Sequence, residues 1–420
     1  MIRSRFGFAN GVRRSAIVGV ACVASVLGVA ACGGGDDDGG GGGDGTVTFG
    51  ANTELSGNLQ VYGLPAEQGM RLGAEAINED GGIEVDGKSY DLKTLAEDNR
   101  SDPSGVVNAA RAVVDSGAIG ALGPDLGAVP SYEVFKQNDI ITLTPAFDLQ
   151  AQLMENPEGN PLLFSPTVFL AELAVTNMKQ IKALFPDVQR VAIMAPDDEQ
   201  GQANAAGYQF AAESEGLAVV GNEAFPVNTT DFTSILTQFK GQNPDLLIAE
   251  QSVEHASAII QQAVELNVAK YALNDVMTPD QAQEIPGADK IPVIIPNFSP
   301  TYSPNATIPD YDPEAVFGDE EPAGNPGAAI DMWYAMRMFA QAIEDAGTVD
   351  DTAAIAEALP GQSYDGPFGT CTMSERRELD CETIVDVVQG DEITVYRFPG
   401  PDSVEPSDTY VCREGDCQAE

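Results

Sequence analysis

Three consecutive acidic residues are the first candidates for chemistry in this chain. Asp197, Asp198 and Glu199 follow the apolar run VAIMAP, so their carboxylates could bind a metal ion or act as a general acid and base. An acidic cluster directly after a strand is more often a solvated turn. The chain has one histidine, His255, placed on a predicted helix surface, and lacks HExxH, GxSxG and Walker motifs. We therefore expect no catalytic set and no enzyme.

Four cysteines near the C-terminus raise two possibilities, a zinc site or two disulfides. Their spacing lacks the paired C-x₂₋₄-C signature of zinc sites, and His255 is far away in sequence. Four cysteines allow three pairings. Because each pair is close in sequence, we favour Cys371 with Cys381 and Cys412 with Cys417. We expect neither a metal nor a cofactor.

The acidic triplet lies in a stretch, 191–251, that alternates apolar runs with helical patterns. It predicts strands over 191–196, 217–225 and 245–251, and helices over 203–215 and 232–241, the second capped at Thr230 or Asp231; the sequence DDEQGQ between the first strand and helix is expected to be a turn. This order predicts three parallel strands in one sheet with right-handed crossovers. Ligand chemistry is then expected beyond their carboxyl ends.

The earlier stretch 46–125 has the same order. It predicts strands over 46–55, 90–98 and 119–125, and helices over 65–80 and 103–116. Two such halves indicate two similar α/β lobes with a binding cleft between them. Further expected elements are helices over 129–138, 171–185, 254–267, 326–346 and from Asp350 or Asp351 to 359, strands over 139–147, 271–274, 291–298, 364–374 and 382–398, and a surface loop over 299–326.

Prolines mark the positions where the chain is expected to cross between the lobes. Pro166 and Pro296 mark two of them, and a third is expected near residue 365. Lobe 1 is then 46–165 plus 297–365. Lobe 2 is 166–296 plus 366–420, with the cysteine-bearing C-terminal segment.

The charge of the chain excludes several partners. Its 420 residues include 21 basic and 65 acidic ones, a net charge of −44. That balance excludes a nucleic-acid surface and opposes docking on anionic lipid. Solubility explains the acidity, unless the acids line the cleft and attract a cationic ligand.

The N-terminal segment predicts export. Residues 1–31 have a basic head and an apolar run from Ala16 to Ala31, which is shorter than the ~20 residues of a membrane-spanning helix. The sequence VAAC at 29–32 looks like a bacterial lipobox, in which Cys32 becomes the N-terminus and carries lipid; an ordinary signal peptide is the alternative. Residues 32–45 then form a Gly/Asp tether. We expect an extracytoplasmic protein, anchored by lipid to the bacterial cell membrane.

Nine segments, in this order, resemble one family of proteins. They are SGNLQVYG, GMRLGAEAINEDGGI, LAEDNRSDP, ALGP, TPAF, NPLLF, VAIMAPDDEQGQ, DFTSILTQFKGQNPDLLIAE and YDGPFGT. From about 46 to 398 the chain resembles the extracellular solute-binding lipoproteins of ABC transporters of the branched-chain amino acid (Leu/Ile/Val-binding, type I periplasmic-binding-protein) type. The resemblance implies two Rossmann-like α/β lobes, with parallel sheets flanked by helices, joined by three crossovers. It also implies capture of a small polar solute, such as an amino acid or amide, by hinge closure, for delivery to the permease of an ABC importer.

The resemblance also implies where the solute binds. In amino-acid-binding members two lobe 1 loops offer hydroxyls to the ligand carboxylate, but here these loops contain Asp125, Leu126 and Gly127, and Ala146, Phe147 and Asp148. Gln200 stands where an aromatic residue commonly covers the ligand, and Asp275, near Asn274, matches the acid that holds the amino group. Candidate residues beyond these are Gln251, at the end of its strand, and Tyr62. Tyr62 and Phe147 could stack on a ligand or pack the lobe edge.

Two of these acids disfavour an α-amino acid. Asp125 and Asp148 would repel a ligand carboxylate by roughly 1 to 4 kcal/mol per close pair at intermediate dielectric. An amide, urea, polyamine or cationic solute is the better hypothesis.

A second function remains open, in which the same lobes form a ligand-sensing module that regulates a membrane partner. The sequence ends at Glu420 without a membrane-spanning helix, which favours capture. A repressor of this fold would need a basic DNA-binding head, and none is present.

Overall fold

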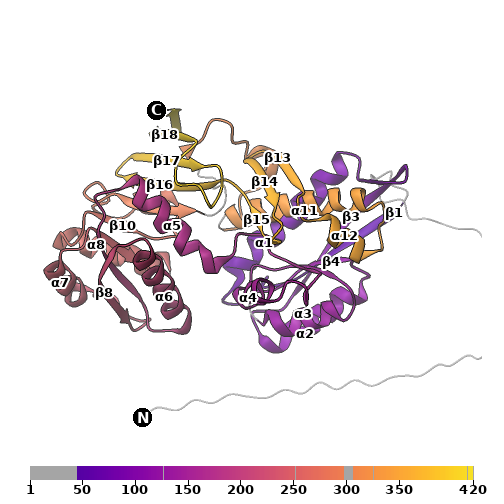
Figure 1. The fold of residues 1–420 in the computed structure, drawn as a ribbon, viewed down its shortest axis with the longest axis horizontal. Coiled ribbons are helices and arrows are strands. Elements are labelled where there is room, and N and C mark those ends of the chain that lie inside the picture. The colour runs from indigo at the N-terminus through magenta and orange to yellow at the C-terminus, as the bar shows by residue number, and fades with distance from the viewer. Residues whose placement is uncertain are drawn as a thin grey trace, which may run out of the picture. The chain divides into compact units, whose positions relative to one another are not determined.

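The computed structural model describes residues 45–125, 127–250, 252–297, 306–324, 326–413 and 415–419. The expected signal peptide, Cys32 and nearly all of the tether lie outside this range. Within it are two large sheets, each flanked by helices (Figure 1). We call the N-terminal sheet with its helices lobe 1 and the other lobe 2.

Lobe 1 is built on six strands in the order β2-β3-β1-β4-β5-β6, and only the β2–β3 pair is antiparallel. The strands are β1 (Gly45–Thr53), β2 (Ile83–Val85), β3 (Lys88–Asp98), β4 (Gly120–Leu122), β5 (Ile141–Leu143) and β6 (Leu163–Phe164). The helices are α1 (Gln60–Glu79), α2 (Pro103–Asp115), α3 (Ala128–Lys136), α4 (Phe147–Glu155), α11 (Pro326–Ala346) and α12 (Thr352–Ala358). The late helix α11 packs along α1, and Phe339 meets Phe49 of β1 edge to face at 5.0 Å.

Lobe 2 is built on ten strands in the order β12-β19-β18-β17-β16-β11-β10-β9-β7-β8. Its parallel strands are β7 (Arg190–Pro196), β8 (Ala218–Phe225), β9 (Leu246–Ala249), β10 (Tyr271–Leu273) and β11 (Val293–Asn297). The C-terminal strands β16 (Thr383–Gln389), β17 (Glu392–Phe398), β18 (Asp408–Arg413) and β19 (Gly415–Ala419) extend it antiparallel, with β12 (Ala306–Thr307) at the edge. The helices are α5 (Leu170–Leu184), α6 (Glu199–Ser214), α7 (Thr233–Gln242), α8 (Val253–Leu266) and α9 (Pro279–Gln283).

The predicted parallel arrangement over 191–251 is confirmed, because β7 pairs in parallel with both β8 and β9. The inward side chains of β7 and β9 are fully buried in every described position, as the β-branched runs predict. The carboxyl ends of these strands therefore lie at one edge of the lobe 2 sheet.

Two helices begin earlier than the sequence predicts. The expected turn DDEQGQ is wrong in its second half, because Asp198 accepts a hydrogen bond from the Gly201 N–H at 2.7 Å and α6 starts at Glu199. Helix α1 starts at Gln60 rather than Pro65, so Pro65 lies inside the helix, where it cannot donate a backbone hydrogen bond to the preceding turn.

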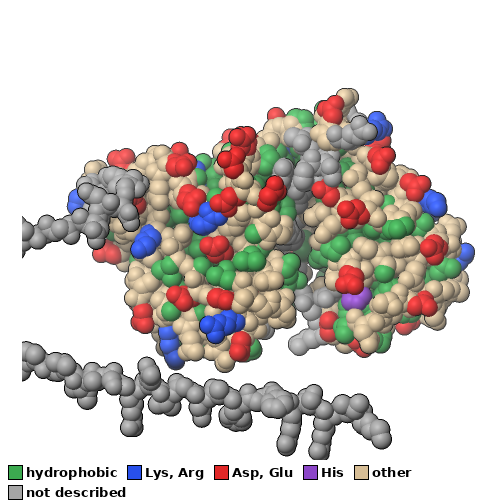
Figure 2. Space-filling view, turned by 180° about the vertical axis from the view of Figure 1, so that it is seen from behind, with side chains coloured by type: hydrophobic (Ala, Val, Ile, Leu, Met, Phe, Trp, Pro, Cys, Tyr) green, Lys and Arg blue, Asp and Glu red, His purple; other side chains and the backbone are tan. Residues whose placement is uncertain are grey.

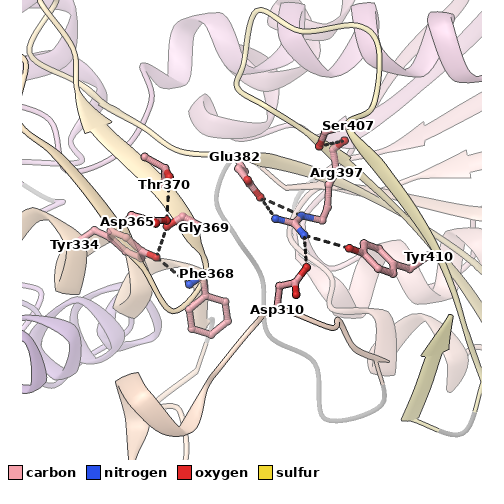
Figure 3. A network of polar contacts seen from close by, with 10 residues as sticks. All are labelled: Asp310, Tyr334, Asp365, Phe368, Gly369, Thr370, Glu382, Arg397, Ser407 and Tyr410. Atoms are coloured by element: carbon pink, nitrogen blue, oxygen red, sulfur yellow. Dashed lines mark hydrogen bonds and ion pairs between the residues drawn. The ribbon is translucent and has the colours of Figure 1, made fainter. Parts of the chain in front are cut away.

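The predicted surface loop over 299–326 is wrong in part: among its described residues, 318–324 are mostly exposed, but 308–317 include buried side chains and a short helix. Ile308, Tyr311 and Phe317 are buried, and residues 314–317 form the short helix α10 (Glu314–Phe317). Figure 3 shows the reason: Arg397 of β17 forms ion pairs with Glu382 and, at 3.8 Å, with Asp310 of this segment. The Arg397 guanidinium also lies over the Tyr311 ring at 5.0 Å, so the segment is packed against the C-terminal strands.

A small third sheet lies in the part of the chain where the third crossing between the lobes is expected. It consists of β13 (Ser363–Gly366), β14 (Gly369–Met373) and β15 (Leu379–Asp380). Ser165, just after β6, donates its N–H to the Arg377 carbonyl at 2.8 Å and accepts from the Leu379 N–H at 3.1 Å. Disulfides join Cys371 with Cys381 and Cys412 with Cys417, the local pairing that the sequence favours.

Candidate functional site

Lobe 1 presents a buried carboxylate where its central strand ends. Glu54 follows β1 and is fully buried. The Asn99 side-chain amide donates to Glu54 Oε1 at 3.2 Å, and the Asp125 N–H approaches Glu54 Oε2 at 3.5 Å. Loops after three neighbouring strands, β1, β3 and β4, therefore meet at this glutamate.

Asp125 stands beside Glu54 on the loop after β4. Its residue surface is exposed to solvent, yet the surrounding protein and the neighbouring Glu54 charge raise its pKa to about 7. The loop then turns at Gly127, whose φ of 68° is left-handed and directly precedes α3. Leu126, the third predicted residue of this loop, lies outside the described residues.

Lobe 2 presents a second pair of carboxyl groups at its own strand ends. Glu250 follows β9 and is fully buried, and Asp275 follows β10 and is half-buried. Tyr208 of α6 donates its hydroxyl to Asp275 Oδ2 at 2.7 Å and accepts from the Asn177 side chain of α5 at 3.0 Å. Burial raises the pKa of Asp275, and burial followed by the charges of Asp275 and Glu250 raises the pKa of Tyr208 well above its usual value.

Tyr62 connects the two groups across the lobes. It lies in the first turn of α1 with 47% of its surface exposed. Burial raises the pKa of Tyr62, and the charges of Asp125 and Asp275 raise it further. Acids of both lobes thus act on the same tyrosine side chain.

The other predicted site residues are less closely connected to this tyrosine. Phe147 is 57% exposed, and Asp148 accepts from the Leu149 N–H at 2.9 Å at the start of α4. Ala146 is buried at the start of the same helix. Among the described residues, no hydrogen bond joins these three to Asp125. The Asn274 side-chain amide donates a hydrogen bond to the Ala249 backbone carbonyl at 2.7 Å. Gln251 and the side chain of Gln200 lie outside the described part of the chain.

Four residues of the site were missed by sequence reasoning: Glu54, Asn177, Tyr208 and Glu250. The two glutamates could have been found, because each lies near the carboxyl end of a predicted strand, over 46–55 and over 245–251. Tyr208 and Asn177 lie on helices, where nothing in the sequence separates them from ordinary surface residues.

The residues that were candidates for catalysis or metal binding do not come together in one site. His255 is half-buried rather than on the helix surface: it packs edge to face on Phe225 and Phe232, and its ring contacts the Val227 carbonyl at 2.9 Å. Within the described residues, no three His, Cys, Asp or Glu side chains are placed to hold a metal ion. No described helix is long and apolar enough to cross a membrane.

A larger surface hollow of about 910 Å³ lies elsewhere on lobe 1. It is lined in part by Asp139, Leu162 and Arg377, and by residues at the start of α12. Residues 139 and 162 precede β5 and β6, so this hollow lies at the amino ends of the strands, opposite the edge where ligands of open α/β sheets bind.

The comparisons with known proteins agree with this architecture. The curated Leu/Ile/Val-binding protein homolog 3 of Brucella melitensis is 23% identical over 364 residues, which are 82% of this chain and 92% of the relative. The branched-chain amino acid transporter substrate binding protein of Streptococcus pneumoniae, solved in complex with isoleucine, superimposes with a TM-score of 0.62 at 20% identity, covering 84% of this chain and all of the other. A solute binding protein of an ABC transporter from R. palustris, in complex with benzoate, gives 0.63 at 15% identity, covering 86% of this chain and 97% of the other.

The family itself is identified over most of the chain. Residues 46–389 match the family described as periplasmic binding protein. The predicted fold class, two α/β lobes of the type I periplasmic-binding-protein fold, is confirmed by the two flanked parallel sheets and the similar solved structures. This chain belongs to the periplasmic binding protein family.

Proposed function

We propose that this protein captures a small solute between its lobes and delivers it to the membrane permease of an ABC importer. The observation that carries the proposal is that Asp125 of lobe 1 and Asp275 of lobe 2, which follow strands β4 and β10, both act electrostatically on the Tyr62 side chain of α1. Support comes from the family match and from similar folds solved with isoleucine and with benzoate.

Capture follows from the position of the site between two lobes. A solute contacts groups of both lobes only when the lobes are closed, so its binding free energy favours the closed form. The hinge lies where Ser165 is bonded to Arg377 and Leu379, which joins two connecting segments side by side. We place the lobe boundaries near residues 165, 297 and 365. Because the bound solute favours the closed form, a permease could distinguish loaded from empty protein.

Delivery outside the cytoplasm requires export and tethering. We propose that residues 1–31 are removed and that Cys32 carries the lipid that holds the protein at the cell membrane. Cys32→Ser should move the protein from the membrane fraction to the medium or periplasm. Continued membrane association of this variant would contradict the anchor.

Binding by the exported chain carrying Cys32→Ser tests the capture proposal. Thermal unfolding is followed with amino acids, aromatic acids, amides and amines, and a solute at 100 times its dissociation constant should stabilise by about 2.7 kcal/mol. The double variant Asp125→Asn with Asp275→Asn should weaken binding of that solute. Equal affinity in this variant would place the solute elsewhere, and binding without loss of uptake in a deletion strain would favour the sensing function.

A further inference from the structure

We propose that the turn between β14 and β15, residues 374–378, sets the orientation of lobe 2 by binding the first turn of helix α5 through Glu378 and Arg376. Both are positioning residues that act on the hinge. Their importance for capture rests on the proposed function, in which the lobes close on a solute.

Helix α5 is anchored in both lobes. Phe169, its N-cap residue, is buried in an apolar cluster of lobe 1 together with Tyr132 of α3 and Leu149 of α4. Further along the helix, Met178 and Ile181 are buried in the cluster that contains the apolar side chains of β7 and β9 in lobe 2. Because the backbone hydrogen bonds of a helix hold its turns together, the direction of the first turn determines where lobe 2 lies.

The first turn of α5 is held by an acid from a distant part of the chain. The Phe169 N–H donates to Glu378 Oε2 at 2.6 Å, although the two residues are 209 positions apart in the sequence. The first N–H groups of a helix have no partner within the helix, and α5 has no side-chain cap of its own. Glu378 therefore supplies the missing acceptor, and its negative charge suits this end of a helix.

Arg376 makes a second attachment beside the first. Its Nη1 and Nη2 donate to the two Glu172 carboxylate oxygens in α5 at 3.1 and 2.9 Å, and its Nε lies 3.2 Å from Glu378 Oε1. Its guanidinium also lies over the Phe169 ring at 5.0 Å. The Glu172 side chain is 49% exposed, so that ion pair contributes little, whereas Glu378 is 5% exposed. Glu378 is the main attachment, and Arg376 orients its carboxylate.

The turn itself is fixed to lobe 1. Arg377 donates from Nη1 to the carbonyl oxygens of Pro157 and Asn160 at 3.0 and 2.8 Å, and its guanidinium lies over the Phe164 ring of β6 at 5.6 Å. Its φ of 67° is left-handed, which is uncommon for a residue with a side chain. Two neighbouring arginines thus bind different parts of the molecule, one lobe 1 and the other α5.

The direction of α5 also determines where one side of the candidate site lies. Asn177 on α5 donates to the Tyr208 hydroxyl at 3.0 Å, and Tyr208 donates to Asp275 at 2.7 Å. These three side chains move with lobe 2. A change of direction at the first turn of α5 would therefore move Asp275 relative to lobe 1.

Glu378 allows its role in positioning to be separated from a role in stability. Burial raises its pKa to about 7, and the charged groups that face it are Arg376, Asp380 and Glu172. At pH 8 Glu378 is ionised, so a neutral residue in its place removes the cost of burying a charge. A change of lobe orientation in such a variant is then not explained by a less stable fold.

The test measures the distance between the lobes in the exported chain carrying Cys32→Ser. Spin labels are attached through Arg111→Cys on α2 of lobe 1 and Glu265→Cys on α8 of lobe 2, both exposed positions, and double electron–electron resonance is recorded at pH 8. Glu378→Ala should broaden the distance distribution, and Glu378→Gln, which keeps an oxygen acceptor, should broaden it less. Glu375→Ala is the matched control, because Glu375 is exposed in the same turn.

Hydrogen exchange gives a second measurement on the same variants. The Phe169 amide should exchange about tenfold faster or more in Glu378→Ala, the effect of losing a hydrogen bond to a charged group. The Met178 amide, inside the helix, should keep its rate. Urea unfolding shows that each variant is folded, and if Glu378→Ala is not, Glu378→Gln decides.

The outcomes separate the role of the turn from capture itself. Distance distributions that stay unchanged in the folded Glu378 variants would overturn the inference, even if the Phe169 amide exchanged faster. Equal broadening in Glu375→Ala would also overturn it, because that residue makes no described bond to α5. These measurements need no solute, so the inference can fail while capture stands, and capture can fail in the solute screen while the lobe distances still respond to Glu378.

Discussion

The hydroxyl of Tyr208 fixes the position and the charge of Asp275. It donates to Asp275 Oδ2 at 2.7 Å while Asn177 donates to it in turn, so a chain of three side chains from α5, α6 and the loop after β10 ends at the cleft. A hydrogen bond to the ionised form of an acid lowers its pKa, and this bond opposes the burial that raises the pKa of Asp275.

Tyr208→Phe should therefore weaken solute binding, because it removes only the hydroxyl that donates to Asp275. A bond to a charged group contributes about 1.5 to 3 kcal/mol, so we expect at least a tenfold rise in the dissociation constant. Titration calorimetry measures it. Tyr132→Phe is the matched control, since the Tyr132 hydroxyl is buried in lobe 1 with no partner among the described residues. Equal affinities in the two variants would contradict a role for Tyr208.

The site could be predicted from the sequence only in part. Asp125 and Asp275 follow apolar runs, and acids at strand ends are visible to sequence reasoning. Glu54 and Glu250 stand at equivalent places, but acidic residues are rarely buried and only the folded lobes show that these two are. The effect of the Asp275 charge on Tyr62 depends on how the lobes are arranged, which no local pattern encodes.

At the scale of elements, close approach of α1 and α11 requires a residue without a side chain. A Cβ on Gly69 would lie 2.0 Å from the Ala329 carbonyl oxygen of α11. The two helices are far apart in sequence, so their contact joins a late helix of lobe 1 to its first.

Gly69→Ala should destabilise the protein by about 1 to 3 kcal/mol, the usual cost of overpacking. Gly207→Ala is the control: it lies inside α6, where a Cβ would meet only the Ala174 Cβ at 3.9 Å, and alanine should stabilise that helix by up to about 1 kcal/mol. Urea unfolding of both variants measures the difference. A neutral Gly69→Ala would show that the helices can separate without loss.

A second element-scale contact is the ion pair between Arg397 and Glu382. Arg397 is 7% exposed, and its Nε and Nη2 donate to Glu382 Oε2 at 3.0 and 2.6 Å. On β18, Arg413 pairs with Glu392 of β17 but is 68% exposed at the side chain. These two Arg–Glu pairs therefore differ in how far water reaches the arginine.

Arg397→Met should cost about 2 to 4 kcal/mol, because it leaves the partly buried Glu382 carboxylate without its counter-charge and removes the guanidinium that lies over Tyr311. Arg413→Met should cost no more than about 1 kcal/mol, as for other exposed pairs. Denaturant midpoints of the two variants test this. Similar small losses would mean that water reaches Glu382 when the arginine is removed.

The elements themselves could be predicted where local signals are strong. Helix α11 has the predicted bounds, and α2 begins at Pro103 as predicted, because proline at a helix start and long apolar periodicity are local features. Strands β18 and β19 were missed, since they are held by pairing with β17 and by a disulfide rather than by apolar content. The burial of Tyr311 depends on the distant Arg397, which lies over its ring, and could not be predicted locally.

At the scale of the whole molecule, the excess of acids combines with several carboxyl groups that are hard to ionise. The chain carries 65 acidic and 21 basic residues, and acidic side chains are spread over the surface that Figure 2 shows. Burial raises the pKa of Asp386 and Glu378 to about 7 and that of Asp380 to about 6. With Asp125, four carboxyl groups hold protons in the folded chain at pH values where they lose them in the unfolded chain.

This predicts a protein that is more stable in mild acid than at neutral pH. Where the folded state binds more protons than the unfolded state, the free energy of unfolding falls as pH rises. The contribution of these four groups is fully present below about pH 4 and is lost as pH rises through their folded pKa values of about 6 to 7. Asp98 and Asp245, whose pKa values are lowered by hydrogen bonds, set the acid limit, since their contribution disappears as they take up protons.

The urea midpoint of the exported chain should therefore be higher at about pH 5 than at about pH 7.5. The midpoint should be highest at a pH above the range in which Asp98 and Asp245 take up protons and below the range in which the four carboxyl groups with raised pKa values lose theirs. Asp386→Asn should reduce the difference, because Asp386 is 3% exposed and asparagine removes its titration while keeping its size. The exposed Asp139→Asn should leave the slope unchanged. A midpoint that increases from mild acid to neutrality would contradict the prediction and mean that the buried carboxyl groups ionise at little cost, through water that enters the hinge and the cleft.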